Sequence, residues 1–491
     1  MDNGLKSGKY DLSKVDLDDP KSLDYFELDK TDWKINALKF AIISAIAIFV
    51  FFVPLGDGKI MFGILYNGLI SLVDKLVTIN GVQVGSLLIC TIILCATGIL
   101  SVYGKFIAKK DSKVYKYFEA DSIIHPVLYM IGGFFIFMYF LDQIGVYHAS
   151  EVIVGPATAG MVIPGVVIGV AAIIPVGAFF IPFLVDYGLI DFFGVLLEPV
   201  MRPAFKVPGK SAVDATASFV GSTTMGIIIT GRMFKTNNYT ARESCVVATC
   251  FSAVSVGYAY VVMEAAQISK HFVITYFVSF VLAFVIAAII ARIPPVSRKP
   301  DTFYNGRLQT DEDRKEATMK FGPDMIKTGI NRGAKRAFVS GNMPKRIIKS
   351  ITDAFPVLPK VITLLCAFGI LGMIAAKYTP IFKWIGYAFL PITKVLGVPD
   401  AMAAAEAIPT GVTEMFIPVL TIADRAAELH IKTRFFVTVV SMLQIIFLAE
   451  SVVVIMNTGI PMKFKELMIV FLERTLIAMP FAALFMHIIF R

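Results

Sequence analysis

A hydrophobic unit bounded by prolines occurs twice in this chain of 491 residues. The first copy reads L-E-P-V-M-R-P-A-F-K-V-P and then, after a run of small residues, G-S-T-T-M, from Leu197 to Met225. The second reads L-P-I-T-K-V-L-G-V-P and then G-V-T-E-M, from Leu390 to Met415. Two long apolar segments follow each copy. A duplicated hydrophobic unit with an interrupted, polar-tipped segment is typical of a secondary-transporter core.

The composition favours a membrane protein over a soluble one. Hydrophobic residues make up 56% of the chain, and several uncharged apolar stretches approach the 20 or so residues that cross a bilayer. The net charge of +9 lies largely in loops that flank these stretches, so it is explained by topology rather than by nucleic acid. We expect no removable signal peptide, because the polar first residues lack the short apolar core of one. We expect an integral protein of the bacterial inner (cytoplasmic) membrane, with the lipid bilayer as a partner.

The apolar stretches divide the chain into five regions. Residues 1–34 form a polar tail that we expect in the cytoplasm, and 35–145 hold N-terminal membrane helices at 35–54, 60–79, 82–104 and 124–145. The segment 60–79 is the weakest of these, and the sequence leaves open whether it spans the membrane and on which side the N-terminus lies. The remaining regions are repeat one (164–292), a basic cytoplasmic loop (293–355) and repeat two (357–491).

Counting crossings predicts that the two repeats are inverted. Each repeat reads as one spanning helix, an interfacial piece, a hairpin that enters the membrane and returns, and two further spanning helices. Three crossings place the second copy on the opposite side from the first, which is the arrangement used for alternating access. The fold class is therefore an all-α polytopic membrane protein with two inverted repeats. The pieces are 164–186, 189–206, 211–234, 242–265 and 271–292 in repeat one, and 357–376, 380–397, 399–421, 434–456 and 466–489 in repeat two.

The predicted solute site lies at the two hairpin tips. Both tips combine helix-breaking residues with hydroxyls, and non-helical backbone at membrane depth is tolerated only inside protein or beside a wet cavity. An alternative is that the small residues only allow close helix packing. The candidate substrate-binding residues are Gly221, Ser222, Thr223, Thr224, Thr410, Gly411, Thr413 and Glu414.

Acidic residues within apolar sequence mark candidates for ion coupling. An ionisable side chain at mid-membrane costs about 2.5–3.5 kcal/mol on insertion scales, so several in one repeat indicate function. Glu414 lies beside the predicted helix break, and Glu450 is expected to face it from the following helix. Glu264 and Glu406 are further candidates. Interfacial positions or structural hydrogen bonds are the alternative explanations.

These units resemble those of YjiH-type bacterial membrane proteins, which carry a nucleoside-recognition (Gate) domain. The tip G-V-T-E, Gly411 to Glu414, is also similar to the G-x-T-E hairpin tip of concentrative nucleoside transporters. In that family the tip lies in the first repeat and a proline follows the acid closely, whereas here it lies in the second repeat and the next proline is Pro418. The resemblance implies a transport fold and a nucleoside-like solute, and Gate-type relatives often assemble into oligomers.

Other motifs carry less weight. The run A-F-K-V-P-G-K-S, from Ala204 to Ser211, satisfies a relaxed phosphate-loop pattern, but the prolines before it are unsuited to the buried strand that such a loop follows. Lys206 and Lys210 are expected at the cytoplasmic interface instead. The five histidines are dispersed, so neither a metal site nor an enzyme is expected, and we expect no cofactor.

The sequence thus predicts a secondary active transporter of a small polar solute, nucleoside-like or another small metabolite, coupled to H⁺ or Na⁺. A channel and a non-transporting membrane scaffold of a larger complex are the alternatives. A homo-oligomer or a small membrane partner subunit would fit either case.

Overall fold

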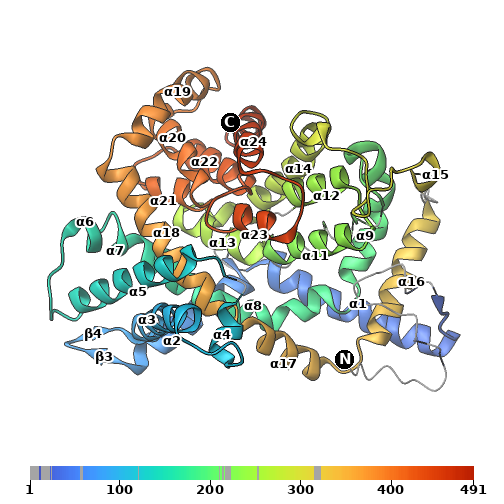
Figure 1. Ribbon diagram of the computed structural model, residues 1–491, viewed down its shortest axis with the longest axis horizontal. Coiled ribbons are helices and arrows are strands. Elements are labelled where there is room, and N and C mark those ends of the chain that lie inside the picture. The colour runs from blue at the N-terminus through green and yellow to red at the C-terminus, as the bar shows by residue number, and fades with distance from the viewer. Residues whose placement is uncertain are drawn as a thin grey trace.

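A computed structural model describes residues 10, 12, 23, 25–55, 59–119, 121–209, 211–212, 215, 223–251, 254–314 and 322–491. Helices dominate these residues, and the only strands among them form two short antiparallel hairpins (Figure 1). The first elements are α1 (Lys30–Phe52), β1 (Pro54–Leu55), β2 (Lys59–Ile60), α2 (Met61–Leu76), β3 (Thr78–Ile79), β4 (Val82–Gln83), α3 (Gly85–Phe106), α4 (Lys113–Phe118), α5 (Ile124–Gln143), α6 (Glu151–Val154) and α7 (Ala159–Val162).

The middle of the chain is built from shorter and more irregular helices. It comprises the π-helical turn η2 (Ile163–Ile168), α8 (Gly169–Val185), α9 (Leu189–Val200), the π-helical turn η3 (Met201–Phe205), α11 (Thr223–Lys235), α12 (Ala241–Cys250), α13 (Val256–Ala265), η4 (Ser269–His271), α14 (Phe272–Ile290), η5 (Val296–Arg298), α15 (Asp311–Arg314), α16 (Pro323–Val339) and α17 (Met343–Ala354). The last part comprises α18 (Leu358–Tyr378), α19 (Ile381–Val395), α20 (Ala401–Ala407), the 3₁₀ turn η6 (Ile408–Val412), α21 (Ile417–Ala423), α22 (Ile431–Leu443), α23 (Ser451–Thr458) and α24 (Phe464–Ile489).

Seven helical stretches in the described ranges are long and apolar enough to cross a bilayer. The prediction of a mostly helical membrane protein is confirmed at this level. The helix α2 has 16 residues and is not one of the seven, which agrees with the weakness of segment 60–79. The seven are Lys30–Phe52, Gly85–Phe106, Ile124–Gln143, Glu151–Val185, Ser269–Ile290, Leu358–Tyr378 and Phe464–Ile489.

Two segments predicted as single spanning helices are interrupted, and this corrects the sequence-based prediction. Segment 242–265 consists of α12 and α13, which end and begin at Cys250 and Val256. Segment 434–456 consists of α22 and α23, with no helix over 444–450. Neither half of either segment reaches the 20 or so residues of a full span. The reason is tertiary: the non-helical backbone is held by other elements, as described below.

The basic region 293–355 is more structured than the predicted loop. Its helix α16 packs against α1 and α9, and α17 packs against α8. Two of its basic side chains make ion pairs with buried acids of α9: Arg332 with Glu198 at 3.5 Å and Arg336 with Asp191 at 3.6 Å. These contacts fix the basic region to α9.

The N-terminal tail also contributes to packing. Leu23 and Phe26 are buried against Val339 of α16. The Nζ atom of Lys335 lies 2.8 Å from Glu27 Oε1. The described part of the tail is therefore fixed to α16, whereas the sequence predicted only a polar arm.

The predicted hairpin 399–421 is formed by α20, η6 and α21. The helix α20 ends at Ala407, the 3₁₀ turn covers Ile408–Val412, and the next helix begins only at Ile417. The two arms pack against each other, α21 also packs against α18 and α22, and α20 packs along α19 (Figure 1). In the counterpart 211–234, residues 211, 212 and 215 are helical, and α11 begins at Thr223.

Candidate functional site

The two interrupted helices end side by side at one buried arginine. Arg474 of α24 has no solvent-exposed surface. Its Nε donates to the carbonyl oxygen of Leu443, the last residue of α22, at 3.1 Å, and its Nη1 donates to the carbonyl oxygen of Thr249 in α12, also at 3.1 Å. The carboxyl end of a helix carries unpaired carbonyls and partial negative charge, so one guanidinium satisfies the ends of two half-helices.

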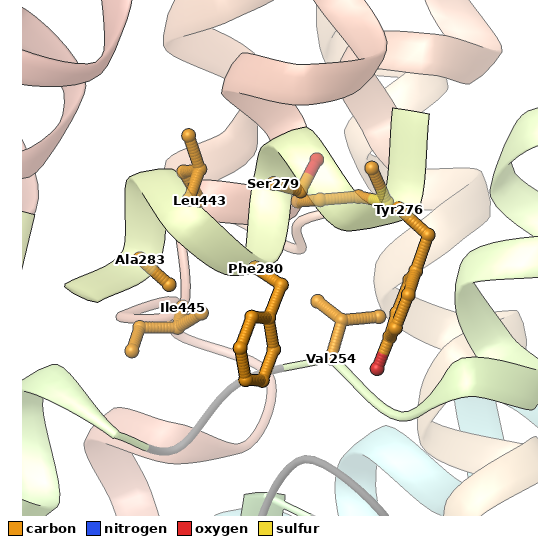
Figure 2. A pocket seen from close by; sticks show the side chains of 8 residues that line it. Val254, Tyr276, Ser279, Phe280, Ala283, Leu443 and Ile445 are labelled. Atoms are coloured by element: carbon orange, nitrogen blue, oxygen red, sulfur yellow. The ribbon is translucent and has the colours of Figure 1, made fainter. Parts of the chain in front are cut away.

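A small cavity lies beside these same two breaks (Figure 2). Its volume is about 20 Å³, which is room for about one water molecule. Val254 lines it from the first break, Leu443 and Ile445 line it from the second, and Tyr276 and Phe280 close it from α14. Both breaks therefore face α14, which packs against α24.

The hairpin tip is bound to the second break by backbone hydrogen bonds. The N–H of Leu448 donates to the carbonyl oxygen of Val412 at 2.9 Å, and the N–H of Ala449 donates to that of Thr413 at 3.0 Å. Ser441 of α22 donates its hydroxyl to the carbonyl oxygen of Met415. Backbone groups that lose a helical partner at the break thus find one in the hairpin, as membrane depth requires.

Glu414 lies at the centre of this arrangement and is 3% exposed. Its Oε1 accepts a hydrogen bond from the hydroxyl of Tyr258 at 3.2 Å, and its Oε2 accepts one from the N–H of Phe416 at 2.6 Å. Tyr258 belongs to α13, beyond the first break, and its ring packs edge-on against Phe416 at 5.8 Å. One carboxylate therefore joins the hairpin 401–423 to the interrupted helix formed by α12 and α13.

The structure places Glu450 near this carboxylate and gives the other candidate acids different surroundings. Glu450 is the N-cap of α23 and lies within electrostatic range of both Glu414 and Tyr258. Glu264 accepts hydrogen bonds from Tyr66 and Asn67 of α2, so it fixes α2 to α13.

Glu406 packs against α19. A Cβ added at Gly386 of α19 would lie 3.1 Å from the Cα and Cγ atoms of Glu406. Within the described ranges, neither Glu406 nor Glu264 shares a hydrogen bond with Glu414. Glu414 and Glu450 are two candidates whose charges interact.

The threonines of the second tip are buried or half-buried and bonded within the hairpin. Thr410 donates its hydroxyl to the carbonyl oxygen of Ala407 at 2.6 Å, and Thr413 donates to that of Thr410 at 2.7 Å. Each hydroxyl oxygen still has lone pairs that could accept a hydrogen bond from a solute. In the first tip, Gly221 and Ser222 lie outside the described residues, and only the backbone of Thr223 and Thr224, at the start of α11, is described.

Gly411 permits close contact between the tip and α22. Gln444 directly follows α22, and its Nε2 donates to the carbonyl oxygen of Ile408 and to Thr475 Oγ1, both at 3.0 Å. A Cβ at position 411 would overlap Gln444 Oε1 and lie 2.7 Å from its Cδ. The glycine is required here by space.

Replacing Gly411 by alanine is therefore expected to destabilise the protein by about 1–3 kcal/mol, the usual range for overpacking. Gln444→Ala should also destabilise the protein on its own. The double variant should lose less stability than the two single variants lose together, because the alanine at 444 removes the two atoms closest to the added Cβ. Gly177→Ala, where a Cβ meets nothing within 4 Å, is the matched control. Thermal unfolding in detergent measures all four variants, and additivity of the two changes would contradict the contact.

Three residues of this site were not predicted from the sequence. Arg474, Gln444 and Tyr258 each lie in apolar sequence, and the first two are strongly polar, which is itself a signal. Tyr258 gives no such signal, since a tyrosine in an apolar helix is usually packing. Across the described ranges, no group of three or more histidine, cysteine, aspartate or glutamate side chains is placed to hold a metal ion.

The fold and the site define a polytopic helical membrane protein with interrupted helices. A family model described as Gate, nucleoside recognition, matches residues 167–293, which include both halves of the first interrupted helix. An uncharacterized protein of Alkalihalophilus pseudofirmus is 31% identical over 481 residues, covering 95% of this chain and 97% of that protein. The chain belongs to the same family as that protein.

Among solved structures, the chain is similar to those of CNTnw. Its inward-facing substrate-bound state is 13% identical and has a TM-score of 0.41, with 87% of this chain and 97% of that chain covered. A doubly substituted form of CNTnw in an outward-facing state is 15% identical with a TM-score of 0.39, covering 93% and 99% of the two chains.

Proposed function

We propose that this protein is a secondary active transporter of a small polar solute of the nucleoside type, coupled to H⁺ or Na⁺. The observation that carries the proposal is the meeting of two interrupted helices and a hairpin tip at Glu414. Such a site offers backbone donors and acceptors together with a carboxylate inside apolar sequence. The match of residues 167–293 to a nucleoside-recognition family supports the choice of solute.

In the proposed mechanism, the solute binds where α13, the hairpin 401–423 and the break 444–450 meet. Thr410 and Thr413 accept hydrogen bonds from it, and the predicted residues of the first tip, Gly221 to Thr224, would add further contacts. Glu414 and Glu450 share the coupling cation, because two neighbouring carboxylates are stabilised when a cation or a proton lies between them.

Alternating access then follows from the proposed inverted repeats, 164–292 and 357–491. Glu414 accepts a hydrogen bond from Tyr258 of α13, so movement of α13 relative to the hairpin would change the surroundings of the carboxylate. Rocking of one repeat against the other would expose this junction first to one side and then to the other.

Uptake into proteoliposomes tests the proposal. The purified protein is reconstituted and offered a panel of nucleosides and other small polar solutes, with an imposed H⁺ or Na⁺ gradient. We expect saturable accumulation of one solute class that disappears when the effective gradient is collapsed. Flux that never saturates and ignores the gradient would identify a channel, and absence of uptake across the panel would favour a scaffold; either result overturns the proposal.

A further inference from the structure

A cleft of about 480 Å³ lies away from the proposed solute site, where α9 and η3 meet the start of α12 and the segment 301–314. Four of its lining residues are cationic, Arg202, Lys206, Arg242 and Arg314, and one is acidic, Asp301. The volume is within the range of small-molecule sites. A cleft with this excess of positive charge attracts anions.

The acids around the cleft do not neutralise it. Asp301 is shared by two arginines, at 3.1 Å from Arg314 Nη2 and 3.6 Å from Arg242 Nη1. Glu243 pairs with Arg202 at 2.7 Å, and Asp311 approaches Arg314 at 3.8 Å. When these two acids are included, the cations still outnumber the acids.

The basic residues of the cleft do not use all of their donors within the protein. The Nε atoms of Arg202 and Arg242 are buried and have no hydrogen-bond partner among the described residues. Lys206 is exposed, and within the same described ranges its ammonium group makes no recorded ion pair. Guanidinium groups match the oxygens of a phosphate with two parallel bonds, and an ammonium adds a point charge.

Hydrogen bonds within the protein also fix the residues that line the cleft. Arg292 donates to the carbonyl oxygens of Pro203 and Ala204, which fixes the turn before Lys206. Lys206 has a left-handed backbone (φ 61°) that terminates η3. Gln309 connects two walls, because its Nε2 donates to Glu243 Oε1 at 2.9 Å and its Oε1 accepts from Arg314 Nε at 3.1 Å.

The loop that carries Arg314 is held in place at neutral pH. The Arg307 guanidinium hydrogen-bonds Asp313 and holds the pKa of that carboxyl well below its usual range, aided by the N–H and hydroxyl of Thr310. An acid with a lowered pKa stabilises the fold above its ordinary titration range and loses this effect only in strong acid. Asp313 thus keeps its hydrogen bonds to Arg307 and Thr310 under the conditions in which a phosphate carries its charge.

We propose that this cleft binds a phosphate group. The phosphate-loop resemblance of Ala204–Ser211 does not explain the site, since a π-helical turn, not a strand, precedes Lys206. The same lysine nevertheless lines the cleft. Two kinds of ligand could supply the phosphate group: a free phosphorylated small molecule on the side of the basic region, or the headgroup of an anionic lipid at the membrane surface.

Binding of inorganic pyrophosphate to the full-length protein in detergent tests the first source. We expect Lys206→Gln to weaken binding about tenfold, as loss of a charged hydrogen-bond partner does, and Lys206→Arg to restore most of it. Higher salt should weaken binding, because exposed charges are screened. Lys109→Gln, an exposed lysine of the loop between α3 and α4, is the control and should bind normally.

Retention of phosphatidylglycerol, counted by native mass spectrometry, tests the second source with the same variants. If the wild type retains lipid but binds no pyrophosphate, and Lys206→Gln loses the lipid, the site binds a headgroup. If the wild type binds pyrophosphate but retains no lipid, and Lys206→Gln loses pyrophosphate binding, the site binds a free phosphate. Arg314→Gln provides a second variant on the opposite wall, and thermal unfolding verifies that each variant is folded. The proposal is overturned if neither probe binds, or if both variants bind both probes as the wild type does.

Discussion

Glu414→Gln is expected to reduce gradient-driven uptake by about 10- to 100-fold while the protein remains folded. A charge-assisted hydrogen bond contributes about 1.5–3 kcal/mol, and each 1.4 kcal/mol corresponds to about a factor of 10. The amide fits the same space. Its oxygen can accept from the N–H of Phe416, and its NH₂ group can donate to the Tyr258 hydroxyl, which then serves as acceptor. The variant therefore removes the charge and keeps the contacts.

Tyr258→Phe gives an independent measure of the same junction. It deletes the hydroxyl that donates to Glu414 and is expected to lower uptake by about tenfold. If the two groups act as a unit, adding Tyr258→Phe to Glu414→Gln should have little further effect. Glu428→Gln, an exposed acid between α21 and α22, is the matched control and should transport normally.

The measurement is initial uptake rate in proteoliposomes, with detergent thermal stability recorded for each variant. Normal, gradient-dependent uptake by Glu414→Gln would show that the carboxylate has no role in coupling. A variant that loses uptake together with its thermal stability would instead assign the residue to folding.

The sequence predicted the membrane character of the fold because hydropathy alone specifies it. Long apolar runs such as 82–104 and 124–145 became α3 and α5, with ends within three residues of those predicted. A run of this kind satisfies its own backbone hydrogen bonds, so no other part of the chain is needed to fix its structure. The same argument predicted α24 over 466–489.

The interrupted helices could not be predicted in this way. The stretch 444–450, Q-I-I-F-L-A-E, contains neither proline nor glycine, and its apolar residues suit a continuous helix. It is non-helical because its backbone bonds the hairpin, through Leu448 and Ala449, and because Arg474 terminates α22. Those partners are distant in sequence, so the break is a tertiary effect.

The candidate site was predicted in part for the same physical reason. Glu414 was identified because an acid in apolar sequence is costly and needs a purpose. Its partner Tyr258 could not be identified, since the contact spans 156 positions of sequence and tyrosine is common in packed helices. Arg474 carried the stronger signal, because it is a cation in the middle of an apolar helix. The sequence-based prediction considered only acidic residues as candidates and therefore did not include it.

Arg474→Met is expected to loosen the ends of α12 and α22 and to remove most transport activity. The arginine donates to one carbonyl at each helix end, and a methionine of similar length leaves both carbonyls unpaired in a dry interior. An unpaired buried polar group costs about 1–3 kcal/mol, so two amount to roughly 2–6 kcal/mol. Removal of a buried charge offsets part of this. We expect a net loss of about 2–4 kcal/mol, well above the effect of Leu476→Met on the exposed face of the same helix.

Thiol labelling reports on the helix ends directly. Cys250 is the last residue of α12, is fully buried, and directly follows Thr249, whose carbonyl Arg474 binds. Release of that carbonyl should let the end of α12 fray, so maleimide should modify Cys250 faster in Arg474→Met than in the wild type, with mass spectrometry to locate the modified residue. Arg474→Lys should give an intermediate rate, since an ammonium keeps the charge but lacks the fork that reaches two carbonyls at once. Unchanged labelling of Cys250 together with unchanged thermal stability in Arg474→Met would show that the half-helices hold their ends without the arginine.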